Sequence, residues 1–129
     1  MTTKPVALII EDDDDLAVIF SGALQAAGYE TEIICTGDMA LTRLAAVTPV
    51  IIVLDLHLPK VGGIEILRQI RADNRLVNSH VLAVSADARM ADVARPQADV
   101  VLVKPISFSL LRDLAMRFLE DRQTSAGPA

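Results

Sequence analysis

Acids, a serine and a lysine end short apolar runs at widely separated points of the chain. Glu11 and Asp12 follow one run, Asp55 follows another, and Ser85 and Lys104 close two more. When strands run parallel in one sheet, their carboxyl ends meet at the same edge. We therefore expect these five side chains to gather in one site.

The charges in such a site determine its chemistry. Two carboxylates about 4 Å apart repel by roughly 4 kcal/mol at an effective dielectric of about 20, so either some are protonated or a cation neutralises them. Mg²⁺ or Mn²⁺ prefers carboxylate oxygens, and Mg²⁺ leaves positions for phosphate oxygens. Lys104 and Ser85 would then hold a phosphoryl group. Asp55 is either a third metal ligand or a nucleophile that forms an acyl phosphate.

The apolar runs alternate with segments of helical periodicity. The runs at 6–10, 31–35, 50–54, 80–85 and 99–104 indicate strands. The third and fifth are continuously apolar, which predicts burial on both faces of a parallel sheet. The fourth helical segment, within 88–95, is short and ends at Pro96. Five alternating units predict an α/β fold, a doubly wound (βα)5 sheet with a short or irregular fourth helix.

Glu11 to Asp15 form an unbroken acidic run, and its members have different predicted roles. Glu11 and Asp12 belong to the site. Asp14 is predicted to cap the N-terminus of the first helix, and Asp15 suits the positive end of that helix. Asp13 is predicted to be an exposed residue between them.

Bulk composition limits the class of protein. The chain has 129 residues, is 52% apolar and has a mean hydropathy of +0.42, which suits one domain with a sizeable core. A net charge of −5 argues against nonspecific binding to nucleic acid or an anionic membrane. No apolar stretch approaches the ~20 residues of a membrane span. The single Cys35 allows no internal disulfide and is predicted to be a small buried hydrophobe. We expect a cytoplasmic protein with one domain over 1–121 and a disordered tail at 122–129.

These motifs, in this order, resemble the receiver domains of two-component response regulators over essentially the whole chain. "LIIEDD" is similar to the acidic pair of that family, "VIIVLDLHLPKVGG" to its phosphoacceptor segment, "VLAVSA" to its Ser/Thr segment and "VLVKP" to its lysine segment. The resemblance implies a flavodoxin-like five-stranded sheet in the order 2-1-3-4-5. It also implies that Mg²⁺ binds Glu11, Asp12, Asp55 and the backbone carbonyl of His57.

The resemblance assigns further roles residue by residue. Asp55 matches the aspartate that is phosphorylated, and Ser85 and Lys104 match the residues that bind the phosphoryl group. His57 and Asp87 lie at positions that tune loss of that group. For Asp87, a plain turn or cap role is an equal alternative.

The lysine segment both follows and departs from the family pattern. The Lys104–Pro105 peptide bond is expected to be cis. Val101, however, stands where the family commonly has Tyr or Phe, so the usual aromatic form of the switch is in doubt. The spacing from Ser85 to Lys104 is also shorter than usual, and Gly62 replaces a usual acid.

The implied function is that of a phosphoacceptor in a phosphorelay, which is not a turnover enzyme. Its partners would be a sensor histidine kinase or a histidine phosphotransfer protein, with a downstream protein target and no direct nucleic-acid contact. The first helix offers Ala17, Val18 and Ala26 as a candidate docking face. Two alternatives are a receiver-like interaction module that acts without phosphorylation, and a hydrolase of the haloacid-dehalogenase type. His57 argues against the hydrolase, because such enzymes have a second aspartate there.

Overall fold

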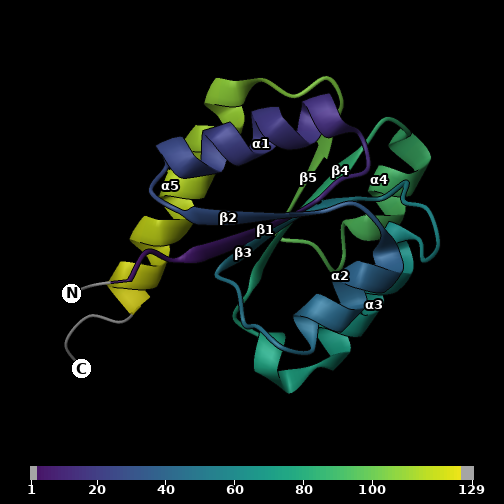
Figure 1. The fold of residues 1–129 in the computed structure, drawn as a ribbon, viewed down its shortest axis with the longest axis horizontal. Helices are drawn as coiled ribbons and strands as arrows, with labels where there is room; N and C mark the ends of the chain where they lie inside the picture. Colours follow the sequence, from purple (N-terminus) through teal and green to yellow (C-terminus); the bar gives the residue numbers. More distant parts are fainter. Residues whose placement is uncertain (1–2, 126–129) are drawn as a thin grey trace.

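The chain folds into one parallel sheet with helices on both faces (Figure 1). The structure is a computed structural model that describes residues 3–125, with side chains described through 121. The strands are β1 (Val6–Ile10), β2 (Glu30–Ile34), β3 (Ile51–Asp55), β4 (His80–Ser85) and β5 (Val100–Val103). Their order is β2-β1-β3-β4-β5, and every neighbouring pair is parallel. The expected order 2-1-3-4-5 is confirmed.

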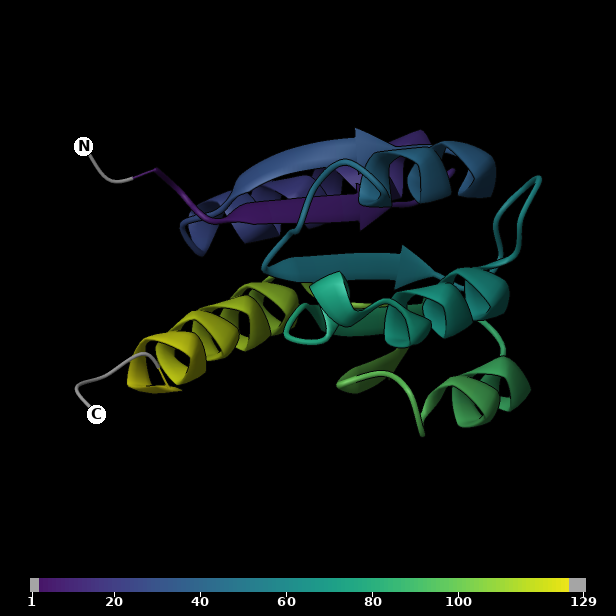
Figure 2. The same cartoon turned by 90° about the horizontal axis from the view of Figure 1, so that it is seen from below.

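The helices form two layers, one on each face of the sheet (Figure 2). Helices α1 (Asp14–Ala26) and α5 (Phe108–Ser125) cover one face. The other face carries α2 (Gly37–Leu44), α3 (Gly63–Ala72) and α4 (Ala88–Ala94), with the short 3₁₀ helix η1 (Asn74–Leu76) after α3. Because both faces are covered, the central strands are apolar throughout, as parallel sheets require.

Strand burial follows position in the sheet, which corrects one expectation. β3 lies at the centre and all five of its residues are buried. β5 was also expected to be buried on both faces, but it is an edge strand and none of its residues is fully buried. The apolar residues of β5 are therefore only partly buried against the helices, and Val103 is exposed.

The helix ends show where local chemistry differs from the sequence-based expectation. Asp13, not Asp14, is the N-cap of α1, and its carboxylate accepts the backbone N–H of Leu16 at 3.0 Å. Asp14 and Asp15 then lie in the first turn, where the helix dipole favours acids. Cys35 was expected to be buried but is exposed, because it lies just beyond the end of β2.

The C-terminal half confirms the short fourth helix. α4 has only 7 residues and is followed by a turn that contains Pro96. α5 continues to Ser125, so residues 122–125 of the expected disordered tail are helical, and 126–129 lie outside the described residues. Within the described part of the chain, no helix combines the length and the apolar character that crossing a bilayer requires.

Candidate functional site

Three carboxylates meet at the carboxyl edge of the sheet, as the sequence predicts. Glu11 follows β1 directly, Asp12 comes next, and Asp55 is the last residue of β3. One oxygen from each carboxylate lies within 4.8 Å of the other two. Glu11 and Asp55 are almost fully buried, with exposed fractions of 1% and 3%, whereas Asp12 is exposed. The cluster therefore has a closed side in the protein and an open side toward solvent.

Among the described residues, Lys104 is the only cationic residue that forms an ion pair with this cluster. Its Nζ lies 3.0 Å from Glu11 Oε1 and 3.8 Å from Asp55 Oδ1. Burial, together with the hydrogen-bonding contact to Asp55, raises the pKa of Glu11 to about 7, although Lys104 acts in the opposite direction. One ammonium group faces three carboxylates, so the donor set fits a divalent cation that prefers oxygen ligands.

The backbone around Asp55 holds its carboxylate toward this cluster. The His57 N–H donates to Asp55 Oδ1 at 3.0 Å, and the Leu56 N–H donates to the Val84 carbonyl at 2.9 Å. Gly63, the first residue of α3, packs against the same segment, and a Cβ there would lie 2.4 Å from the Asp55 carbonyl oxygen. The Asp55 carboxylate is therefore held by the His57 N–H, and the Asp55 backbone is held by its packing against Gly63.

Ser85 reaches the site but its hydroxyl is engaged locally. Ser85 Oγ donates to the Asp87 carbonyl and accepts the Asp87 N–H, both at 2.9 Å. The His57 ring is largely at the surface, yet its Nε2 lies 3.5 Å from Ser85 Oγ. The Asp87 carboxylate accepts the Arg89 N–H at 2.8 Å as the N-cap of α4, which is the cap alternative considered for it.

Comparison with known proteins agrees with this geometry. The family model described as the response regulator receiver domain matches residues 7–116. The chain belongs to the response regulator receiver family. It is 31% identical over 107 residues to the DNA-binding response regulator MtrA of Mycolicibacterium smegmatis, covering 81% of this chain and 46% of MtrA. It is also 31% identical over 122 residues to the polar-differentiation response regulator DivK of Brucella ovis, covering 92% of this chain and 98% of DivK.

The structural comparison gives the same family. A CheY-like response regulator receiver domain from Methylobacillus flagellatus superposes with a TM-score of 0.79 at 26% identity, covering 90% of this chain and 99% of that one. This chain spans about half the length of MtrA, whereas it spans nearly all of DivK. It is thus a receiver domain of the two-component response regulators.

Near β5, the Lys104–Pro105 peptide bond follows the expected receiver pattern, whereas Val101 departs from it. The Lys104–Pro105 peptide bond is cis, and the Lys104 N–H donates to the Ser85 carbonyl at 2.8 Å. Val101, in place of an aromatic residue, is half-buried and packs against the core beneath α4 with Met90. This position therefore carries no aromatic ring.

Sequence reasoning missed two contacts of this receiver site. It assigned Lys104 to the phosphoryl group but not to the ion pair with Glu11. It also treated the His57 ring as a rim group, whereas the ring approaches Ser85. The Lys104 pair has a sequence signal, since both residues end strands of the same parallel sheet. The His57 contact has none, because it depends on the path of the loop after β3.

Proposed function

We propose that Asp55 accepts a phosphoryl group from a phosphohistidine on a sensor histidine kinase or a histidine phosphotransfer protein. One observation carries this proposal: the buried Asp55 carboxylate belongs to a cluster of three carboxylates and lies 3.8 Å from the Lys104 ammonium group. A carboxylate so placed is oriented for attack, and opposite charge is close by for the phosphoryl oxygens. Positioning and charge neutralisation are what phosphoryl transfer chiefly needs.

The proposed reaction exchanges one bond at phosphorus for another. A carboxylate oxygen of Asp55 attacks the phosphorus, the P–N bond to the donor histidine breaks, and the imidazole nitrogen keeps the electron pair. Water later attacks the acyl phosphate and releases inorganic phosphate and free Asp55. Because hydrolysis of the acyl phosphate is slow, the domain serves as a switch and not as a turnover enzyme.

Glu11, Asp12, Asp55 and the His57 backbone carbonyl would hold Mg²⁺ or Mn²⁺ in this proposal. The observation that supports the fit is the excess of carboxylates over cationic groups in the cluster. When bound, the metal supplies charge neutralisation for the phosphoryl oxygens. Lys104 and Ser85 would bind those oxygens as well. Ser85 must first release the Asp87 carbonyl, which links the phosphoryl group to the loop before α4.

The donor protein would dock on the apolar patch where α1 meets α5. Ala17 was expected in this face, but it is buried and cannot contact a partner. Val18 and Ile19 of α1 and Phe108 of α5 are exposed apolar residues, and Phe108 packs beside Gly22 of α1. These residues flank the edge of the sheet that carries Asp55. The downstream target is proposed to be a protein, because the net charge of −5 opposes direct contact with nucleic acid.

Phosphorylation by acetyl phosphate and Mg²⁺ tests the proposal directly. Intact mass spectrometry should show one phosphoryl adduct, which Asp55→Ala abolishes. Asp92→Ala is the matched control, since it removes an exposed carboxylate on α4 that pairs only with Arg95. An adduct that persists undiminished in Asp55→Ala, or no adduct on the wild-type chain, would overturn the proposal.

A receiver-like module that acts without phosphorylation is the second candidate. Val101 and the 7-residue α4 favour it, because both lie in the region that would transmit the switch. Nuclear magnetic resonance with beryllofluoride and Mg²⁺ separates the candidates. Shifts at Asp55 and Ser85 support the phosphoacceptor, whereas an unchanged spectrum supports the second candidate.

A further inference from the structure

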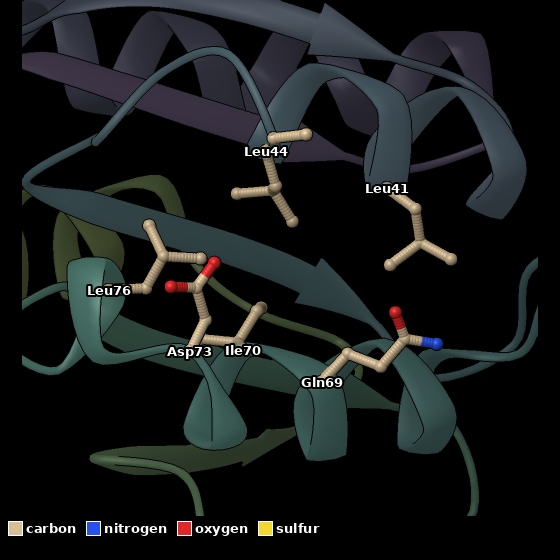
Figure 3. A pocket seen from close by; sticks show the side chains of 7 residues that line it. Leu41, Leu44, Gln69, Ile70, Asp73 and Leu76 are labelled. Atoms are coloured by element: carbon tan, nitrogen blue, oxygen red, sulfur yellow. The ribbon is translucent and has the colours of Figure 1, made fainter.

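A cavity lies between α2 and α3 at the C-terminal ends of both helices (Figure 3). Asp55 ends β3 at the opposite edge of the sheet, where the two helices begin. Its volume is about 140 Å³. It is lined by side chains from the C-terminal parts of both helices and from η1, namely Leu41, Leu44, Ala45, Gln69, Ile70, Asp73 and Leu76. Its apolar walls and its polar groups point to one class of ligand.

Most of the residues that line the cavity are apolar. Leu44, Ile70 and Leu76 are each at most 3% exposed and belong to the main core cluster beneath α2 and α3. Leu41 packs against the same cluster from α2. An enclosed apolar cavity of about 150 Å³ can hold one benzene-sized molecule, and this pocket has a similar volume but is open to solvent on one side. The space therefore suits a compact apolar body of the size of a single ring.

The polar groups set the charge of the ligand. In Figure 3 the Asp73 carboxylate and the Gln69 amide both reach from α3 toward α2 across the cavity. Asp73 Oδ1 accepts the Arg75 N–H at 2.9 Å, and Oδ2 contacts the Arg75 guanidinium at 3.3 Å. A carboxylate has about four lone-pair sites, so Asp73 retains room for another donor. A cationic donor fits this end.

Arg75 does not offer the complementary site for an anion. Its guanidinium also donates to the carbonyls of Leu44 and Val47 and to Thr48 Oγ1. These contacts hold the C-terminal end of α2 against η1 and leave the guanidinium occupied. The Gln69 amide offers both a donor and an acceptor, so the Asp73 carboxylate is the charged group that lines the cavity.

Both helices that line the cavity also hold the segment that follows Asp55. Gly37 begins α2, and its N–H donates to the Pro59 carbonyl at 3.1 Å; a Cβ there would lie 1.9 Å from the Val61 carbonyl oxygen. Gly63 begins α3 and packs equally tightly on Asp55. Because both glycines pack closely against the backbone of this segment, a change in the separation of α2 and α3 should also displace the segment.

We propose that the α2–α3 cavity binds small organic ammonium compounds with a single-ring apolar body, and that binding is coupled to the segment from Asp55 to Gly63. The ammonium group donates to Asp73 and the ring contacts Leu41, Leu44 and Ile70. The site is distinct from the acidic cluster and needs neither metal nor phosphorylation. The proposal therefore stands or falls separately from the phosphoacceptor function.

Backbone amide spectra of the metal-free, unphosphorylated chain, titrated with benzylamine, test the proposal. We expect saturable shifts around the cavity with a dissociation constant on the order of 1 mM, together with shifts at Gly37 and Gly63. Benzyl alcohol should bind more weakly and benzoate should not bind. Unsaturable shifts, or equal shifts with benzoate, would show that no such site exists. Saturable shifts that stop short of Gly37 and Gly63 would overturn the coupling.

Three variants identify the groups responsible. Asp73→Asn keeps an oxygen that can cap η1 but removes the charge, so benzylamine affinity should fall about fivefold while benzyl alcohol affinity stays unchanged. Asp92→Asn, a carboxylate paired with an arginine on α4, is the matched control and should change neither. Leu41→Phe fills the cavity from its wall and Ala45→Leu from its rim, and either should abolish binding. Unaltered benzylamine binding in Asp73→Asn would contradict the proposed recognition.

Discussion

At the scale of single residues, the site combines a buried acid with an incomplete balance of charge. Glu11 is 1% exposed and shares Lys104 with Asp55. Burial raises its pKa to about 7, mainly because a charged carboxylate loses solvation there. The same residue is a candidate metal ligand. In the metal-free chain, its burial therefore opposes ionisation of the Glu11 carboxyl group.

This shift predicts a pH dependence of stability in the metal-free chain. Because the folded pKa of Glu11 lies above its ordinary value of 4.5, the folded state binds the proton more tightly than the unfolded state. The stabilisation is complete below about pH 4.5 and is lost as the pH rises through about 7. Urea unfolding in EDTA should show a loss on the order of 2 kcal/mol over this range from this residue.

The variants Glu11→Gln and Glu65→Gln isolate that contribution. Glu11→Gln should flatten the pH profile, since glutamine resembles the protonated acid. Glu65 is the control, because its pKa is lowered by the hydrogen bond from Arg68 and its removal should leave the loss between pH 5 and 7 in place. A Glu11→Gln profile parallel to that of the wild-type chain would contradict the assignment.

His57 allows a second prediction at this scale, which rests on the proposed phosphorylation of Asp55. Its ring nitrogen lies 3.5 Å from Ser85 Oγ and its backbone N–H donates to Asp55, so we expect the ring to narrow the approach of water to Asp55. His57→Ala should open this approach to water and shorten the lifetime of the acyl phosphate on the order of threefold, less than 1 kcal/mol in the barrier. Intact mass spectrometry after removal of the phosphodonor measures the lifetime. His80→Ala is the control, since His80 begins β4 at the opposite edge and stacks on Phe118.

At the scale of elements, the strands were predictable because parallel packing demands continuous apolar runs. The expected strands 6–10 and 80–85 agree with β1 and β4 residue for residue. The burial of β5 was not predictable from its own residues, because an edge strand and a central strand can have the same composition. Likewise, Asp13 and Asp14 are equally good caps, and only the path of the chain after β1 selects Asp13.

The two successive glycines at the start of α3, the N-cap Gly62 and the first helical residue Gly63, give a prediction at the element scale. A Cβ on Gly63 would lie 2.4 Å from the Asp55 carbonyl oxygen and 2.5 Å from Leu56 Cα, so backbone must move to admit it. Gly63→Ala should cost at least about 2 kcal/mol of unfolding free energy. Gly62→Ala is a matched control one residue away, where a Cβ meets nothing within 4 Å, and should stay within about 0.5 kcal/mol of wild type. Equal losses in urea unfolding would show that the close approach is not what fixes Gly63.

At the scale of the whole molecule, the carboxyl ends and the amino ends of the strands carry different polar groups. The carboxyl edge gathers the candidate site from residues far apart in the sequence, and the motifs predicted this gathering. The opposite edge carries a polar network that no motif announced. Arg71 of α3 donates to the carbonyls of Gln97 and Ser79 and to Asp99 Oδ2, which also accepts the Val81 N–H at 2.7 Å.

This network anchors the strand that leads to Lys104. β5 pairs only with β4 and has 4 residues, so few ladder hydrogen bonds hold it. Arg71 is only 21% exposed in its side chain and joins α3 to the turn before β5. Because a lysine cannot reach all three acceptors at once, Arg71→Lys should restore only part of what Arg71→Ala loses.

Arg71→Ala should therefore lower the unfolding free energy by about 2 kcal/mol and accelerate hydrogen exchange of the β5 amides more than those of β1. Arg68→Ala is the control from the same helix. Among the described residues, Arg68 pairs only with Glu65, at the surface, so this variant should cost no more than about 0.5 kcal/mol, without a selective effect on β5. Uniform acceleration across all strands in Arg71→Ala would mean that the network stabilises the fold as a whole. Selective acceleration in β5 would instead show that one edge of the sheet holds the strand whose other end presents Lys104 to Glu11 and Asp55.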